Sequence, residues 1–291
     1  MEILRYTGNR DKEFTHNIAM KRYYDKENKR LVYIGESATP EFWDEHWDTQ
    51  TFRATMGKGG NNRFVLKILG KYIPDKNGRI LEGGCGMGQI VFCMKAHGYQ
   101  AIGVDFADKT VENVKEAMPE LDVRVGDVRN LPFPDDYFVG YWSLGVIEHF
   151  WDGYQNIIEE MRRVVINGGF LFLSFPYMSP LRRLKAKLGL YEDLRGDRKA
   201  KFYQFALDPK TVVNNFKTMG FTLLHAKPTS GLKGFKDEVT LFKHLLQRLF
   251  DYQGDNLAIK GLRFILDKLL SSFAGHMMFL VLRNEKKRTE A

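Results

Sequence analysis

The stretch RILEGGCGMGQIVFCMKAHG, residues 79–98, decides the fold of this chain. Its first residues form an apolar strand, glycines then crowd a turn, and a helix is expected from Gln89 to Ala96. Gly84, Gly86 and Gly88 have no β-carbon, so they can adopt positive φ angles and let the backbone approach a ligand closely. The stretch therefore predicts a strand–turn–helix unit with a ligand held against the turn.

Short apolar strands and amphipathic helices alternate from this turn onward, over residues 79–226. Such alternation is typical of an α/β fold with a parallel sheet. We expect strands at 79–84, 100–105, 122–127, 137–144, 169–176, 221–226 and 276–284, and helices at 89–96, 108–118, 154–165 and 208–220. Residues 230–275 lie outside this alternation and predict two further amphipathic helices, at 237–250 and 256–273.

Length and composition indicate how many domains the chain forms, which cell compartment it suits and which kinds of site it can build. A chain of 291 residues can bury one sizeable core but leaves little for a second domain. Its two cysteines, Cys85 and Cys93, suit a reducing compartment and provide neither a disulfide framework nor a zinc site. The N-terminus is charged from residue 2 onward, and no run of 18 apolar residues occurs. We therefore expect a cytoplasmic protein without a bound metal.

The basic charge is concentrated in one segment. The chain has a net charge of +8, and residues 177–275 hold 18 basic and 9 acidic side chains, whereas residues 1–176 hold 22 and 25. A localised positive face suggests an anionic partner, which could be a phosphorylated substrate, a membrane surface or nucleic acid.

Acidic residues lie near the ends of the first three expected strands. The glycines depart from the dinucleotide pattern G-x-G-x-x-G, because Gln89 occupies its third position, and they form E-x-G-x-G-x-G led by Glu82. Asp105 ends the second strand, where a carboxylate can accept hydrogen bonds from both hydroxyls of a ribose. Asp127 follows the third strand and can accept from an exocyclic amine such as adenine N6.

Together these residues resemble a class I S-adenosylmethionine-dependent methyltransferase of the small-molecule, lipid or saccharide type. LEGGCGMG, GVDFA, GDVRNLPFPDDYF and GVIEHF match the motifs of that family in order and at the usual spacing, over roughly residues 75–226. The resemblance implies S-adenosylmethionine as cofactor and a doubly wound, Rossmann-like α/β sheet of seven strands with the last strand antiparallel. The cofactor-binding residues that it implies are Glu82, Gly84, Cys85, Gly86, Gly88, Asp105, Phe106, Asp127, Val128 and Leu144.

The resemblance also divides the chain. It implies a methyltransferase core of residues 79–229 and 276–284, with an acceptor-side insertion at 177–207. Residues 1–78 would then be an N-terminal extension with lid helices, and residues 230–275 a helical insertion.

Methyl transfer from a sulfonium is a direct displacement, so the protein mainly aligns the reacting atoms and excludes water. A general base helps when the acceptor is a hydroxyl. His149, with Glu148 beside it, lies just past the fourth strand and is the expected base. The alternative is that His149 is structural and caps the next helix.

Aromatic residues are expected to contact the acceptor. Trp43 and Trp47 are four residues apart and share one helical face, so they could form a lid over the sulfonium. Ordinary core packing is the alternative. Tyr203 and Phe205 lie between the fifth and sixth strands, where relatives often build the acceptor pocket.

The sequence lacks the motifs of two kinds of nucleic-acid methylation. Cytosine C5 methylation needs a cysteine nucleophile after a proline, but both cysteines lie in the cofactor turn and its helix. The Asn or Asp followed by Pro-Pro and an aromatic residue, usual in amino-group methylation of DNA bases, is also missing. We expect a small-molecule, lipid-linked or saccharide acceptor methylated at oxygen. The alternative is a non-catalytic or regulatory protein that binds S-adenosylmethionine.

Residues 230–275 and the segment SPLRRLKAKLGLY, residues 179–191, combine apolar helical faces with basic residues. Their apolar faces could pack against the sheet or against a second subunit in a homodimer. Alternatively, they could contact the anionic inner surface of a membrane as interfacial helices.

Overall fold

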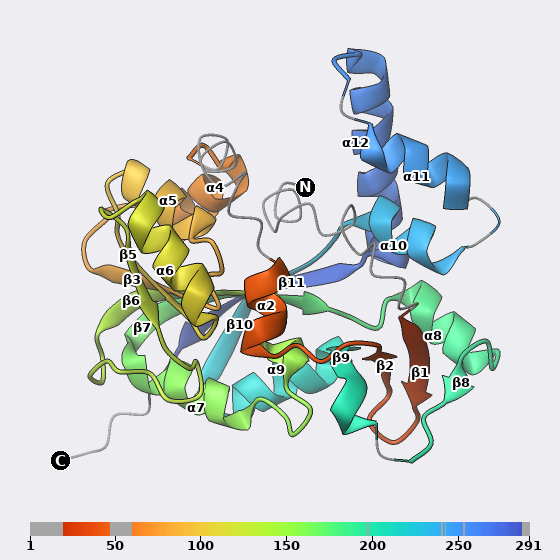
Figure 1. Ribbon diagram of the computed structural model, residues 1–291, viewed down its shortest axis with the longest axis horizontal. Helices are drawn as coiled ribbons and strands as arrows, with labels where there is room; N and C mark the ends of the chain where they lie inside the picture. Colours follow the sequence, from red (N-terminus) through yellow and green to blue (C-terminus); the bar gives the residue numbers. More distant parts are fainter. Residues whose placement is uncertain are drawn as a thin grey trace.

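The computed structural model of the chain describes residues 20–46, 60–196, 198–239, 241, 243–252 and 254–286. A seven-stranded sheet with the order β10-β11-β7-β6-β3-β4-β5 forms its centre (Figure 1). Six strands run in one direction, and β11 runs antiparallel to both of its neighbours, β7 and β10. The predicted α/β sheet with an antiparallel last strand is therefore confirmed. The strands are β3 (Arg79–Gly83), β4 (Gln100–Asp105), β5 (Asp122–Val125), β6 (Phe138–Leu144), β7 (Val165–Pro176), β10 (Phe221–Thr229) and β11 (Met277–Asn284).

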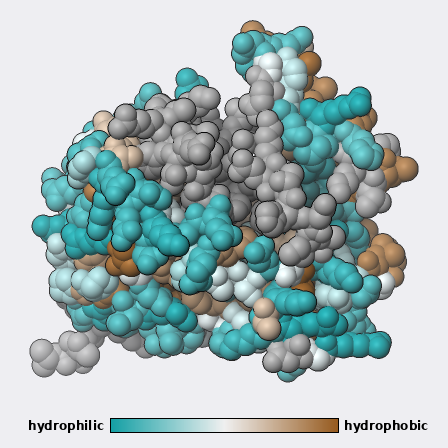
Figure 2. All heavy atoms as spheres, viewed as in Figure 1, coloured by the Kyte–Doolittle hydropathy of each residue, from teal (hydrophilic) through white to brown (hydrophobic). Residues whose placement is uncertain are grey.

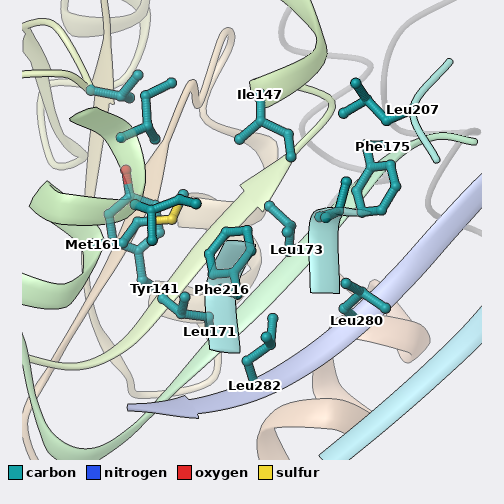
Figure 3. Packing of buried hydrophobic residues seen from close by; sticks show 14 of the residues in the cluster. Tyr141, Ile147, Met161, Leu171, Leu173, Phe175, Leu207, Phe216, Leu280 and Leu282 are labelled. Carbon is teal, nitrogen blue, oxygen red and sulfur yellow. The ribbon is translucent and has the colours of Figure 1, made fainter. Parts of the chain in front are cut away.

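Helices cover both faces of this sheet. Neighbouring strand residues point to opposite faces, so Tyr141 and Leu171 pack into one hydrophobic cluster while Trp142 and Phe172 pack into the other. Figure 3 shows the first cluster, in which Phe216 lies against the sheet. Both faces of the parallel strands are therefore shielded from water. The first face is covered by α7 (Gln155–Val164) and α9 (Pro209–Thr218), and the second by α4 (Arg63–Tyr72), α5 (Gln89–Ala96) and α6 (Asp108–Ala117).

A second sheet, with the order β8-β1-β2-β9, was not predicted. Its hairpin comes from the N-terminal extension, and its two outer strands come from the expected acceptor-side insertion. The N-terminal extension therefore contributes strands as well as the short helix α2 (Pro40–His46), and it pairs with a segment far away in sequence. The strands are β1 (Lys21–Asp25), β2 (Arg30–Ile34), β8 (Glu192–Asp193) and β9 (Phe202–Ala206).

In its described residues, the region between β10 and β11 forms three α-helices instead of the expected two. The helix expected at 237–250 is divided, because α10 (Gly231–Glu238) ends before Val239 and α11 spans Lys243–Asp251. The expected helix at 256–273 corresponds to α12 (Leu257–Ala274). A methyl group on Gly234 would overlap the carbonyl oxygen of Ala274, so only glycine allows α10 and α12 to cross this closely. Among the described helices, none is both long and apolar enough to cross a bilayer.

A buried carboxylate joins these outer segments. The Glu238 side chain is fully buried at the end of α10. It accepts hydrogen bonds from Arg22 of β1 at 2.7 Å, from Arg182 and Lys185 of α8 (Pro180–Lys187) at 3.0 and 2.8 Å, and from Tyr191 at 2.7 Å. Burial alone would raise the pKa of Glu238, but the cations of Arg182 and Arg22 outweigh burial and lower that pKa to about 2.

This pairing makes the stability of the protein depend on pH. Because the pKa of Glu238 is lower in the folded state than its ordinary value of 4.5, the stabilisation is present above pH 4.5 and is lost as the pH falls toward 2. We expect Glu238→Gln to lower the free energy of unfolding by about 3 kcal/mol near neutral pH, since it leaves Arg182 buried without its counter-charge.

Urea unfolding followed by circular dichroism between pH 7 and pH 2 measures both effects. Glu192→Gln, at an exposed position of β8, is the control and should change the unfolding free energy by less than about 0.5 kcal/mol. An unchanged acid-unfolding profile for Glu238→Gln would contradict the stabilising role of this carboxylate.

Candidate functional site

A cavity of about 690 Å³, including its open mouth, lies at the carboxyl ends of the central strands. In open α/β sheets this edge is where ligands bind. The lining residues come from the turns after β3, β4, β5 and β6 and from the segment around α2. They are Ala38, Trp43, Gly84, Asp105, Phe106, Gly126, Asp127, Val128, Arg129, Leu144, Gly145, Val146, His149 and Phe150.

The glycine turn after β3 forms one wall of this cavity. Gly84, Gly86 and Gly88 have φ angles of +73°, +50° and +71°, in the left-handed region that favours glycine. A methyl group on Gly84 would overlap Cγ2 of Val146, which lies on the neighbouring wall. The turn therefore needs glycine both for its backbone conformation and to leave room beside Val146.

Asp105 lies at the end of β4 and is bound to the same turn. Its carboxylate accepts hydrogen bonds from the backbone N–H of Gly86 at 2.7 Å and of Ala107 at 3.0 Å. Burial raises the pKa of the Asp105 carboxyl, and these backbone bonds offset the rise only in part. A ligand that donated further hydrogen bonds to this carboxylate would favour its charged form.

The other predicted cofactor-binding residues divide into two groups. Phe106, Asp127, Val128 and Leu144 line the cavity together with Gly84 and Asp105, whereas Glu82, Cys85, Gly86 and Gly88 are not among its lining residues. Glu82 is buried, and burial followed by the nearby Asp105 raises its pKa well above the ordinary value. Across the described residues, no group of three or more His, Cys, Asp or Glu side chains is arranged to hold a metal ion.

Arg129 is a cavity residue that the sequence analysis missed. Its guanidinium pairs with the Asp127 carboxylate at 2.6 Å and lies 5.3 Å from the centre of the Phe150 ring. Although burial acts in the opposite direction, the bonds from Arg129 lower the pKa of Asp127. The only signal in the sequence was the spacing D-x-R, which permits the observed bond of 2.8 Å from the Arg129 backbone N–H to Asp127.

His149 lies on the opposite wall with Trp43 and Phe150, whereas the predicted acceptor residue Tyr203 is not among the cavity-lining residues. His149 follows β6 in the short helix η1 (Ile147–His149), and its Nδ1 lies 2.8 Å from the carbonyl oxygen of Tyr203. Because a carbonyl only accepts, Nδ1 carries the proton in the neutral imidazole, and Nε2 is the basic nitrogen. The Trp43 ring meets the imidazole edge to face at 5.2 Å. His149 does not cap the next helix, because the N-cap of α7 is Tyr154. Glu148 is buried and is not among the cavity-lining residues.

The remaining predicted acceptor residues do not join this wall. Trp47 lies outside the described residues. Phe205 packs in the hydrophobic core, 4.4 Å from the Phe202 ring and 5.8 Å from the Trp151 ring. The expectation that Phe205 lines the acceptor pocket is therefore corrected. A register shift between β2 and β9 breaks the two-residue alternation that would place Tyr203 and Phe205 on one face.

Comparison with known proteins matches residues 81–173 to the family described as methyltransferase domain. A protein of Mycolicibacterium smegmatis, named as a probable S-adenosylmethionine-dependent methyltransferase, is 35% identical over 97 residues, which cover 33% of this chain and 37% of that protein. The 27-O-demethylrifamycin SV methyltransferase of Amycolatopsis mediterranei is 27% identical over 145 residues, 46% of this chain and 52% of its own length. The aligned segments thus span between a third and about half of these relatives.

A solved structure from Galdieria sulphuraria supports the fold. It is described as a candidate sarcosine dimethylglycine methyltransferase, has a TM-score of 0.51 and 13% identity, and the comparison covers 80% of this chain and 87% of that one. At this identity the likeness shows the fold alone.

We expect Gly84→Ala to destabilise the protein by about 3 kcal/mol, because alanine is strained at this φ angle and its methyl group overlaps Val146. Gly153→Ala is the matched control, since Gly153 also has positive φ (+97°) but a methyl group there would have no other atom within 4 Å. That control should cost about 1 kcal/mol from backbone strain alone. Thermal unfolding of the two variants tests the difference, and equal losses would mean that contact with Val146 does not require glycine.

Proposed function

We propose that this chain, which belongs to the class I S-adenosylmethionine-dependent methyltransferases, transfers a methyl group from S-adenosylmethionine to an oxygen atom of a small-molecule, lipid-linked or saccharide acceptor. One observation carries the proposal. The glycine turn, the Asp105 carboxylate and the Asp127 carboxylate come from three separate strand ends, and they line one cavity together with His149.

The charges around the cavity suit a ligand with cationic groups. S-Adenosylmethionine carries a sulfonium and an ammonium, and it supplies the methyl group when bound. Asp105 and Glu82 are buried close to each other, and burial favours their neutral forms. A cation bound near the turn would favour the charged carboxylates, so Asp105, which lines the cavity, would recognise the charge of the cofactor as well as its hydroxyl groups.

The residues would hold different parts of the cofactor. Asp105 would accept from the ribose hydroxyls, because its carboxylate lies on the cavity wall at the end of β4. Asp127 would accept from the adenine amine at the rim, with Val128 beside it. Gly84 would leave space for the methionine part, since any larger residue there would overlap Val146.

His149 would take the proton of the acceptor hydroxyl. The Tyr203 carbonyl fixes the tautomer in which Nε2 is basic, so the imidazole is oriented before the acceptor binds. As the acceptor oxygen bonds to the methyl carbon and the bond from methyl to sulfur breaks, the hydroxyl proton would move to Nε2. Trp43 packs against this histidine and would help to exclude water.

Oxygen as the methylated atom is supported by His149 and by the rifamycin relative, whose name places its own reaction at an oxygen. A direct test is isothermal titration calorimetry with S-adenosylmethionine, followed by measurement of S-adenosylhomocysteine after incubation with polar and lipid extracts of a cell lysate. Cofactor binding with acceptor-dependent release of S-adenosylhomocysteine would support the enzyme. Binding without release from any extract would favour a non-catalytic role.

Asp105→Asn should weaken S-adenosylmethionine binding at least tenfold. Charge-assisted hydrogen bonds contribute about 1.5–3 kcal/mol each, and the amide of asparagine cannot accept with both of its heteroatoms. Asp108→Asn, an exposed position three residues further on in α6, is the control and should bind normally. Calorimetry on both variants gives the affinities, and unchanged binding by Asp105→Asn would remove Asp105 from the cofactor site.

His149→Ala should lower turnover a hundredfold or more and leave the affinity for S-adenosylmethionine nearly unchanged, because the loss is in proton transfer. His97→Ala is the control: that ring also bonds a carbonyl through Nδ1, at 3.0 Å from Cys93, but it does not line the cavity. Rates of S-adenosylhomocysteine formation with an active extract measure the effect. Turnover within a few-fold of the parent would mean that His149 is structural.

A further inference from the structure

The exposed hydrophobic side chains gather on one part of the molecule. Of the 14 large hydrophobic residues that are exposed among the described ones, three lie within residues 184–190, two within 241–245 and six within 257–273. Figure 2 shows hydrophobic residues along the right-hand edge of the molecule, where Figure 1 places α8, α11 and α12. We call the exposed apolar side chains of these three segments, with the basic residues between them, the docking surface.

The longest part of this surface is one side of α12. Leu262, Ile265, Leu269 and Phe273 recur every three or four residues and are 51%, 54%, 70% and 44% exposed. The opposite side of the helix packs against α10, where Gly231 and Gly234 approach the α12 backbone. Packing against the rest of the chain therefore covers only half of α12, and its other half is an apolar stripe facing solvent.

Basic side chains lie among these apolar residues. On α8, the exposed Lys187 and Arg183, which also pairs with Asp208 at 2.7 Å, are next to Leu184 and Leu188, which are 46% and 63% exposed. Arg248 of α11 and Lys268 of α12 are also exposed. An apolar face bordered by arginine and lysine is the arrangement that binds an interface between lipid tails and anionic headgroups.

The acidic residues of the same segments are engaged within the chain. Within the described parts of residues 180–190 and 243–274, the carboxylates are those of Asp251, Asp255 and Asp267. Asp251 accepts from the Gln247 side chain at 2.7 Å, Asp255 pairs with Lys260 at 2.8 Å, and Asp267 accepts from the Leu232 backbone at 3.1 Å. The docking surface therefore offers a partner apolar area and positive charge.

We propose that this surface docks reversibly on an anionic lipid bilayer. A second copy of the chain is a poorer occupant, because a two-fold symmetric contact would set the basic residues of one copy against those of the other, and the fully exposed carboxylate of Asp255 already pairs with Lys260. An anionic bilayer complements both properties of the surface. This inference concerns attachment and is independent of the proposed reaction.

The position of the docking surface determines where the cavity would lie relative to a bilayer. α8 begins four residues after β7 ends, at the carboxyl edge of the sheet that also carries the cavity. α12 contacts α8, so these two helices of the docking surface lie next to each other near that edge. Docking would therefore hold the cavity edge near the bilayer.

The test is co-sedimentation with phosphatidylcholine vesicles that contain or lack phosphatidylglycerol, at low and high salt. We expect the full chain to bind the anionic vesicles at low salt and to bind them more weakly at high salt. Leu262→Glu/Leu269→Glu should weaken binding at least a hundredfold, because two inserted apolar side chains become charged. Lys187→Glu/Lys268→Glu should weaken it at least thirtyfold, at about 1 kcal/mol for each basic residue.

Matched controls separate docking from general effects. Leu224→Glu changes an exposed leucine of β10 outside the surface, and Lys67→Glu/Lys115→Glu makes the same charge change on α4 and α6. Both should bind vesicles almost as the parent does, and thermal unfolding confirms that every variant is folded. The proposal is overturned if the parent stays in the supernatant with all vesicles, or if both lysine pairs weaken binding equally. It is also overturned if sedimentation equilibrium shows a dimer that Leu262→Glu/Leu269→Glu dissociates, since a second copy would then cover the stripe.

Discussion

The hydrogen bond of 2.7 Å from the Gly86 backbone N–H to the Asp105 carboxylate is the constraint on which the rest of the site depends. It joins the turn after β3 to the end of β4, so two neighbouring parallel strands end in one rigid unit. Gly84 is thereby held against Val146, which follows β6 on the other side of β3. Three strand ends are thereby fixed relative to one another at the cavity wall.

The sheet was predictable from the sequence because its signals are local. The bounds of β4 and α5 in the structure are those expected from strand and helix periodicity alone. The second sheet was missed: its hairpin of β1 and β2 is local, but β8 and β9 join it from distant positions, as in the pair of Tyr23 with Glu192. The division between α10 and α11 was missed for a similar reason. The apolar periodicity continues through Val239, but Glu238 is bound to cations from β1 and α8, and this tertiary contact coincides with the end of the helix.

The residues of the candidate site also differ in how well the sequence predicted them. Gly84, Asp105 and Asp127 could be placed from the sequence because each lies at or just after the end of a strand, and parallel strands end at a common edge. Phe205 was misplaced because its orientation depends on a register shift between β2 and β9, which a two-residue alternation does not reveal. The contact of His149 with Tyr203 was equally hidden, since 54 residues separate them and the second sheet brings them together.

The two halves of the cavity therefore have different physical origins. The cofactor half is built from turns that follow adjacent strands, so local sequence fixes it. The half around His149 depends on α2 and β9. Trp43 of α2 packs against the imidazole. β9 brings the Tyr203 carbonyl beside it, and this strand belongs to a sheet that pairs distant parts of the chain. Glu238 ties that sheet to the docking surface, because its carboxylate binds Arg22 of β1 and Arg182 of α8 at once. A displacement of α8 would therefore be passed to β1 through this buried, charged contact.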